Sequence, residues 1–154
     1  MPAVSMRFAY VHRIFVGVHG AQNPSDEEWS KHCAHIARVR HENLGVLVYT
    51  QGGGPSSKQR QQMRIALHDT PAPPTAILTD STFVRGMITS LNWFLGNQVA
   101  AFEPSELERA LGYLQRDGQT IAREEIVRTL VSLGQELQLK LPACIADAAL
   151  ASAS

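Results

Sequence analysis

The sequence lacks an excess of either charge, a set of paired cysteines and a long apolar run. Lys plus Arg and Asp plus Glu both number 14 among 154 residues, so no global field attracts nucleic acid or an anionic membrane. Cys33 and Cys144 are far apart and belong to no C-x-x-C motif, which argues against a disulfide framework. No run approaches the roughly 18 apolar residues that span a bilayer. We expect a cytoplasmic protein with no nucleic-acid partner and no membrane span.

Signatures of metal binding and catalysis are also missing. His32, Cys33 and His35 lie close in sequence, but on a helix Cys33 points with the apolar stripe and the two histidines lie on the polar side. A zinc site normally needs three or four convergent ligands. The chain contains no G-x-S-x-G nucleophile elbow and offers no identifiable base for Ser56 or Ser57. We therefore expect no metal, no cofactor and no catalytic residues.

The apolar pattern predicts an α/β domain. Buried strands are expected over residues 13–20, 44–50, 75–80 and 98–102, with 6–11 as a hairpin partner of the first. Helix-period segments cover residues 26–41, 56–67, 82–95 and 104–115. Alternation of apolar strands with amphipathic helices is typical of a parallel sheet joined by right-handed crossovers. The expected architecture is a four- to five-stranded, mostly parallel sheet with flanking helices.

Beyond residue 118 the sequence predicts one more helix and a tail. Ile126, Leu130, Leu133 and Leu137 form a stripe within 121–139, which indicates an amphipathic helix. We divide the chain into an α/β domain at 1–118, the additional helix at 119–140 and a flexible tail at 141–154. The helix is expected to pack on the same domain; a partner helix or a homodimer contact is the alternative.

The stretch "YTQGGGPSSKQR" at 49–60 has the composition of a phosphate-binding loop. A P-loop counted from Gly52 requires a glycine where Ser57 stands and a hydroxyl where Gln59 stands. The Rossmann pattern fails as well, because it also requires a glycine at Ser57. The segment is predicted to be a strand-to-helix turn, in which Ser56 and Gln59 form a capping box. Free N–H groups at that helix start leave anion binding as the functional alternative.

A second polar loop follows the strand expected at 75–80. Asp80 and Ser81 end this strand and can cap the next helix. If the two strands are neighbours, both loops lie at the carboxyl edge of the sheet, where open α/β domains bind ligands and partners. The candidate partner- or anion-binding residues are Gly52, Gly53, Gly54, Ser56, Ser57, Asp80, Ser81 and Arg85.

The string "TDSTFVRGMITSLNWF", followed by "AAFEPSELERALGYL", resembles the SpoIIAA-like group of the STAS superfamily, small bacterial domains related to anti-sigma factor antagonists. The matching residues are Asp80, Ser81, Arg85, Gly86, Ala101, Phe102, Glu106, Leu107, Ala110, Leu111, Tyr113 and Leu114. The resemblance covers roughly residues 13–115 by element order, with distinctive residues only in 79–114. It implies a sheet flanked by helices that binds proteins or small ligands without chemistry of its own.

The same resemblance suggests a phosphoacceptor. Anti-sigma factor antagonists carry a phosphorylated serine at the start of the helix after a strand, and Ser56 and Ser57 occupy the analogous place. Their surroundings, "GGGPSSKQ", lack the aspartate and the glycine of that motif. The expected function is a non-catalytic protein-interaction or regulatory module. A small anion- or ligand-binding protein or enzyme, and a self-associating structural protein, are the alternatives.

Overall fold

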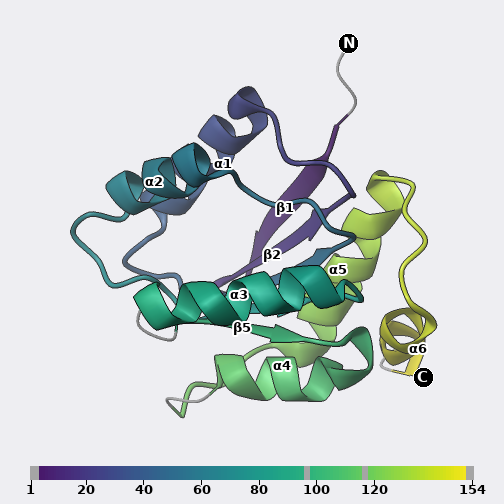
Figure 1. Ribbon diagram of the computed structural model, residues 1–154. Helices are drawn as coiled ribbons and strands as arrows, with labels where there is room; N and C mark the ends of the chain where they lie inside the picture. The colour runs from purple at the N-terminus through teal and green to yellow at the C-terminus, as the bar shows by residue number, and fades with distance from the viewer. Residues whose placement is uncertain (1–3, 96–97, 116–117, 152–154) are drawn as a thin grey trace.

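The protein is a five-stranded α/β domain (Figure 1), seen in a computed structural model that describes residues 4–95, 98–115 and 118–151 and side chains except those of 89–95. The strands are β1 (Met6–Val11), β2 (Ile14–His19), β3 (Gly45–Thr50), β4 (Thr75–Leu78) and β5 (Val99–Phe102). They lie side by side in chain order. Only the β1–β2 pair is antiparallel. The predicted mostly parallel sheet is therefore confirmed.

The helices are α1 (Asp26–Arg38), α2 (Ser57–Ala66), α3 (Thr82–Leu95), the short 3-10 turn η1 (Pro104–Glu106), α4 (Leu107–Leu114), α5 (Arg123–Glu136) and α6 (Ala143–Ala151). Helices α1 to α5 lie within the segments predicted to be helical, and α6 lies in the predicted tail. Helix α1 begins at residue 26 because Ser25 caps it: the Ser25 hydroxyl accepts a hydrogen bond from the Glu28 amide. The Glu28 carboxylate in turn accepts one from the Ser25 amide, which completes a capping box.

Alternate residues of each strand face opposite sides of the sheet. In β3, Val46 and Val48 pack against α1 and α2, whereas Leu47 and Tyr49 belong to a larger cluster with α4, α5 and α6. Strands β2 to β5 follow one another in one direction, and right-handed crossovers then carry α1, α2 and α3 over one face. The remaining helices cover the other face.

The C-terminal part of the chain is more ordered than its sequence suggests. Helix α5 packs on β1 and β2, and Ile126 and Leu130 are fully buried, so this helix belongs to the same core as the sheet. The tail expected to be flexible from residue 141 instead forms α6. Ile145 in this helix is fully buried in the cluster of α4 and α5, and that contact holds it; residues 152–154 lie outside the described part of the chain.

We find no helix in the described ranges with both the length and the apolar character needed to cross a membrane.

Candidate functional site

The carboxyl edge of the sheet brings the two predicted loops together. Strands β3 and β4 are parallel neighbours, with Tyr49 paired to Leu78 near their ends. The glycine-rich loop leaves β3 and the Asp80-Ser81 loop leaves β4, so both begin at the same edge. Each loop then enters a helix, α2 or α3.

The glycine-rich loop is held by its own hydrogen bonds. The Gly52 amide donates to Thr50 Oγ1 at 3.0 Å, and the Gly53 amide donates to the Gly20 carbonyl at 2.9 Å. The Gly54 amide donates to Asn23 Oδ1 at 3.3 Å. These are the groups that a phosphate would require, and each already has an acceptor within the chain.

Backbone contact explains the glycine at position 53. A Cβ there would lie 2.1 Å from the carbonyl oxygen of Gln22, so no larger residue fits beside the loop between β2 and α1. Gly52 has a φ of 138°, in the region that favours glycine. Chain geometry therefore requires glycine at positions 52 and 53, whereas a Cβ at Gly54 would meet nothing within 4 Å.

The two serines of the loop have different roles. Ser56 caps α2: its hydroxyl accepts from the Gln59 amide at 3.2 Å, and its amide donates to Gln59 Oε1 at 2.9 Å. The predicted capping box is thus confirmed. Ser57 is exposed, and its hydroxyl accepts a hydrogen bond from Arg60 Nη2 at 2.9 Å. A cationic side chain therefore lies beside an accessible hydroxyl at the start of a helix.

Gln59 connects this loop to its neighbours. Its side-chain amide donates to the Pro24 carbonyl at 3.0 Å and to Asp26 Oδ1 at 3.1 Å. Its backbone carbonyl accepts a hydrogen bond from Trp29 Nε1 at 2.8 Å. Gln59 is buried, with 3% of its surface exposed. The starts of α1 and α2 are consequently held to each other at the carboxyl edge.

The second loop directs its side chains differently. The Ser81 hydroxyl accepts from the Val84 amide at 3.1 Å, so Ser81 caps α3 as expected. Arg85 turns back toward the sheet, where Nη1 donates to the Thr79 carbonyl at 2.9 Å and Nη2 lies 3.5 Å from Glu103. Asp80 remains exposed beside the strand end.

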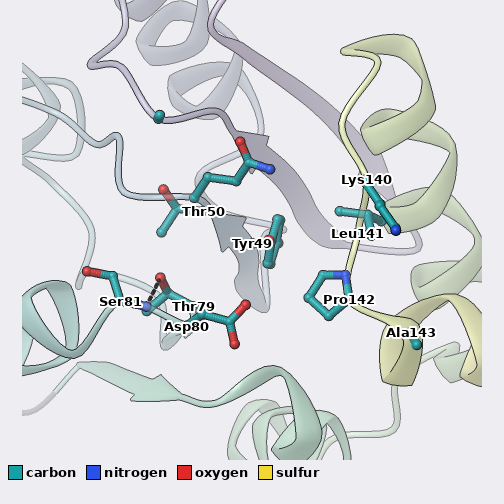
Figure 2. Close-up of a pocket in the computed structure, with 11 residues that line it drawn as sticks. Tyr49, Thr50, Thr79, Asp80, Ser81, Lys140, Leu141, Pro142 and Ala143 are labelled. Carbon is teal, nitrogen blue, oxygen red and sulfur yellow. Dashed lines mark hydrogen bonds between the residues drawn. The ribbon is translucent and has the colours of Figure 1, made fainter.

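A cleft of about 570 Å³ opens between the strand ends and the chain that links α5 to α6 (Figure 2). Its lining residues are Ala21, Tyr49, Thr50, Gln51, Thr79, Asp80, Ser81, Lys140, Leu141, Pro142 and Ala143. Of the predicted site residues, only Asp80 and Ser81 line it. Gly52, Gly53, Gly54, Ser56, Ser57 and Arg85 lie at the same edge but outside the cleft.

Sequence reasoning missed the remaining walls of this cleft. Tyr49 forms part of it, and burial, with the negative charge of Asp80 adding to it, raises the pKa of the Tyr49 phenol. The sequence could have indicated Tyr49 as a site residue, because it stands at the end of a predicted buried strand. The sequence contained no comparable signal for Lys140, Leu141 and Pro142, because only the packing of α5 and α6 brings them to this edge.

His32 corrects one prediction. It was expected on the polar side of α1, yet it is 8% exposed and its ring stacks on Phe8 with centroids 3.8 Å apart. Burial, helped by the nearby His19 and His35, lowers the pKa of His32 to about 3. Strand β1 supplies the aromatic cover that helical periodicity alone does not reveal.

His19 lies in the same cluster, at the end of β2. It is 4% exposed, and burial lowers its pKa to about 4 although the charge of Glu28 opposes the shift. In the ranges that the structure describes, no three His, Cys, Asp or Glu side chains are grouped to hold a metal ion.

Comparison of the chain with protein-family models, with curated proteins and with solved structures found no match.

Proposed function

We propose that this protein is a non-catalytic binding or regulatory module that engages a protein partner through the carboxyl edge of its sheet and the start of α3. One observation carries the proposal: Phe83 is 78% exposed, next to the loop of Asp80 and Ser81. Met87, one turn further along α3, is 43% exposed. Aromatic residues and methionine are enriched at protein interfaces, where a few buried anchor residues carry most of the binding energy.

The glycine-rich loop supports a protein partner over a phosphate ligand. Its three glycine amides already donate to Thr50, Gly20 and Asn23. A phosphate would have to displace these bonds and would leave their acceptors unpaired, at a cost of about 1–3 kcal/mol for each buried group. A protein surface needs no such displacement.

The resemblance to anti-sigma factor antagonists agrees with this function and suggests its regulation. Ser57 is exposed, and its hydroxyl accepts a hydrogen bond from Arg60. A phosphate on Ser57 would gain both the guanidinium and the positive end of the α2 dipole. Ser56, whose hydroxyl caps the helix, would lose its capping geometry on modification. We therefore favour Ser57 over Ser56 as the regulated residue.

The test is affinity capture from the native cell with Phe83→Asp. We expect a protein partner that the wild type retains and the variant loses. Leu150→Asp is the control: Leu150 is 70% exposed on α6, and the change likewise replaces an exposed apolar side chain with a carboxylate. A partner retained equally by both variants would contradict this surface.

The second candidate is a small-ligand-binding protein, which the cleft beside Tyr49 favours. Asp80 and Lys140 supply opposite charges to its lining. A thermal-shift screen with nucleotides and phosphorylated metabolites separates the two functions, because a ligand at 100 times its Kd stabilises by about 2.7 kcal/mol. Stabilisation that Lys140→Ala abolishes would favour the ligand-binding function.

Self-association through α5 has less support. The stripe of Ile126, Leu130 and Leu133 is buried within the chain's own core, so it offers no surface to a second copy.

A further inference from the structure

The charged residues of α2 are all basic. Lys58, Arg60 and Arg64 lie within this helix, which contains no Asp or Glu. Helices α1 and α5 begin instead with acidic residues, the arrangement that the helix dipole favours. Lys58 lies in the first turn of α2, where the dipole disfavours a cation, and Arg60 directly follows that turn. Departures from such local preferences are expected at functional sites.

No carboxylate neutralises these cations within residues 4–95, 98–115 and 118–151. All the ion pairs of those residues lie outside α2. Two acids that flank the helix are engaged with other groups. Asp69 accepts from Arg40 with both carboxylate oxygens, at 2.7 and 3.1 Å, and Asp26 Oδ1 accepts from the side chain of Gln59 at 3.1 Å. The basic side chains of α2 therefore retain their full charge.

Neutral acceptors position two of the three cations. Arg60 Nη1 donates to the Pro55 carbonyl at 3.0 Å, and its Nη2 donates to the Ser57 hydroxyl at 2.9 Å. Arg64 Nη2 donates to Gln61 Oε1 at 2.6 Å. A guanidinium has five N–H donors, so both arginines keep donors for a further acceptor. Side chains that are already positioned lose less entropy when a partner binds.

One side of α2 is turned outward. The other side is occupied, because Gln62 donates to Ser30 on α1 at 3.0 Å and Met63 packs against Phe15 and its neighbours in the core. Figure 1 shows α2 beside α1. Residues 57, 61, 64 and 65 share the outward side, at spacings of three and four, and all of them are exposed. With the two cations that flank them they form the α2 surface: Ser57, Lys58, Arg60, Gln61, Arg64 and Ile65.

The composition of the α2 surface selects its occupant. Ile65 is 64% exposed amid the cations, so the surface offers positive charge around one apolar contact. A membrane is disfavoured, because the apolar side of α2 is packed in the core and the three cations are fewer than the roughly 4–8 of lipid-binding basic segments. Nucleic acid is disfavoured by the net charge of zero. An acidic protein segment needs neither an apolar stripe nor a global field.

We propose that the α2 surface docks an acidic segment of a partner protein. Carboxylates of the partner lie against Lys58, Arg60 and Arg64, and an apolar side chain lies against Ile65. The proposal rests on the protein-partner function proposed above and assigns the chemical character of that partner.

The test is an NMR titration of the full chain with a short blocked peptide of Glu and Asp residues around one leucine. We expect saturable shifts of the amide signals of residues 57–65, and none with the same peptide carrying Gln and Asn instead. Raising the ionic strength to about 1 M, where the screening length is about 3 Å, should weaken binding.

Variants locate the contact. Arg64→Gln should weaken the acidic peptide about threefold, because one exposed ion pair contributes less than a tenfold change in affinity. The triple change Lys58→Gln, Arg60→Gln and Arg64→Gln should weaken it about tenfold or more. Arg128→Gln is the matched control: Arg128 is exposed on α5, and the chemical change is identical. It should bind as the wild type does.

Three results would overturn the proposal. The first is the absence of saturable shifts in α2 with the acidic peptide. The second is an equal loss of affinity in Arg64→Gln and Arg128→Gln, which would show a general effect of charge. The third is a response of α2 to phosphatidylserine vesicles or to a DNA duplex that exceeds its response to the peptide. Arg64→Gln changes an exposed side chain, so it decides the matter even if the triple variant does not fold.

The titration is separate from the capture experiment with Phe83→Asp. It uses a synthetic peptide and needs no cellular partner. Failure of the titration alone would contradict the acidic occupant of α2 and leave the surface around Phe83 standing, whereas failure of the capture alone would contradict that surface.

Discussion

The two faces of the sheet are buried by different kinds of side chain. The face under α4, α5 and α6 is mainly aliphatic, with Tyr49 and Phe102 as its buried aromatic residues, and Leu47, Leu78 and Leu130 are fully buried there. The face under α1 and α2 contains aromatic, histidine and amide groups, among them His32 and the buried Gln59. The first face is therefore held by apolar area, and the second by directional contacts as well.

This difference shows which face supports the candidate site. Gln59 and Glu28, both at the starts of helices on the α1–α2 face, hold loops through hydrogen bonds. The Glu28 carboxylate accepts from the Ser5 amide at 2.9 Å and from the Ser5 hydroxyl at 2.7 Å, while Gln59 holds Pro24. Burial opposes the ionisation of Glu28, but hydrogen bonds from Ser25 and Ser5 keep its pKa at about 2. The polar face thus positions the carboxyl edge, and the aliphatic face supplies bulk stability.

The largest expected effect is on the aliphatic face. Leu130→Ala should lower the free energy of unfolding by about 2–5 kcal/mol, because a fully buried leucine loses its contacts and leaves a cavity. Urea denaturation measures the change. Leu150→Ala, at an exposed position of α6, should stay within about 0.5 kcal/mol of the wild type. Equal values for the two variants would mean that α5 is not part of the core.

Acid should destabilise the protein through the face under α1 and α2, where the buried histidines lie. His19 and His32 have pKa values lowered by burial to about 4 and about 3, below the 6.5 of an exposed histidine. At pH values between the folded-state pKa of each histidine and 6.5, the unfolded chain binds more protons than the folded one. The stability is therefore complete above pH 6.5 and falls as the pH decreases toward 4. The loss is expected to be a few kcal/mol, at about 1.4 kcal/mol per unit of pKa difference.

Urea denaturation between pH 7 and pH 4 measures this loss. His32→Phe, which retains a ring against Phe8, should reduce the dependence on pH. His68→Phe is the control, because His68 is exposed. If His32→Phe leaves the dependence of unfolding free energy on pH as unchanged as His68→Phe does, the buried histidines have no role in it. Glu28 acts in a lower window, since its lowered pKa removes stability only below about pH 4.5.

Much of the fold follows from sequence period and capping chemistry. Four apolar runs and one hairpin partner predicted the five strands, because buried strands are continuous apolar segments. Ser56 predicted the start of α2, since a serine three residues before Glu or Gln forms a local motif. The position of both loops at one edge followed from β3 and β4 being neighbours.

Long-range packing accounts for what the sequence did not reveal. His32 is buried because the Phe8 ring stacks on it, and that ring fits only because Gly17 lacks a Cβ, which would lie 2.3 Å from the ring. Lys140 and Leu141 reach the carboxyl-edge cleft through the turn that ends α5. Neither arrangement leaves a local pattern, because both join segments far apart in the chain.

The smallest effect is expected at that turn. Helix α5 ends in a Schellman motif, in which the Leu139 amide donates to the Gly134 carbonyl and the Gln138 amide donates to the Gln135 carbonyl, both at 2.9 Å. Gln138 has a φ of 57°, a conformation that costs a residue with a Cβ about 1–2 kcal/mol. Gln138→Gly should therefore stabilise the protein, by about 1 kcal/mol or less once the added freedom of glycine in the unfolded chain is subtracted.

Thermal denaturation of Gln138→Gly and Gln138→Ala measures this gain. Alanine retains the Cβ and should give no stabilisation, so a gain shared by both variants would point to loss of the glutamine side chain instead. The sign of this change in stability also bears on how the wall of the carboxyl-edge cleft is held. The left-handed residue directs the chain toward Lys140 and Leu141, and Leu141 packs on Gly134, where a Cβ would lie 2.9 Å from its side chain. Stabilisation by glycine would show that the aliphatic face holds the linker in place through this turn, so that both faces contribute to the carboxyl edge: hydrogen bonds on one side and a packed turn on the other.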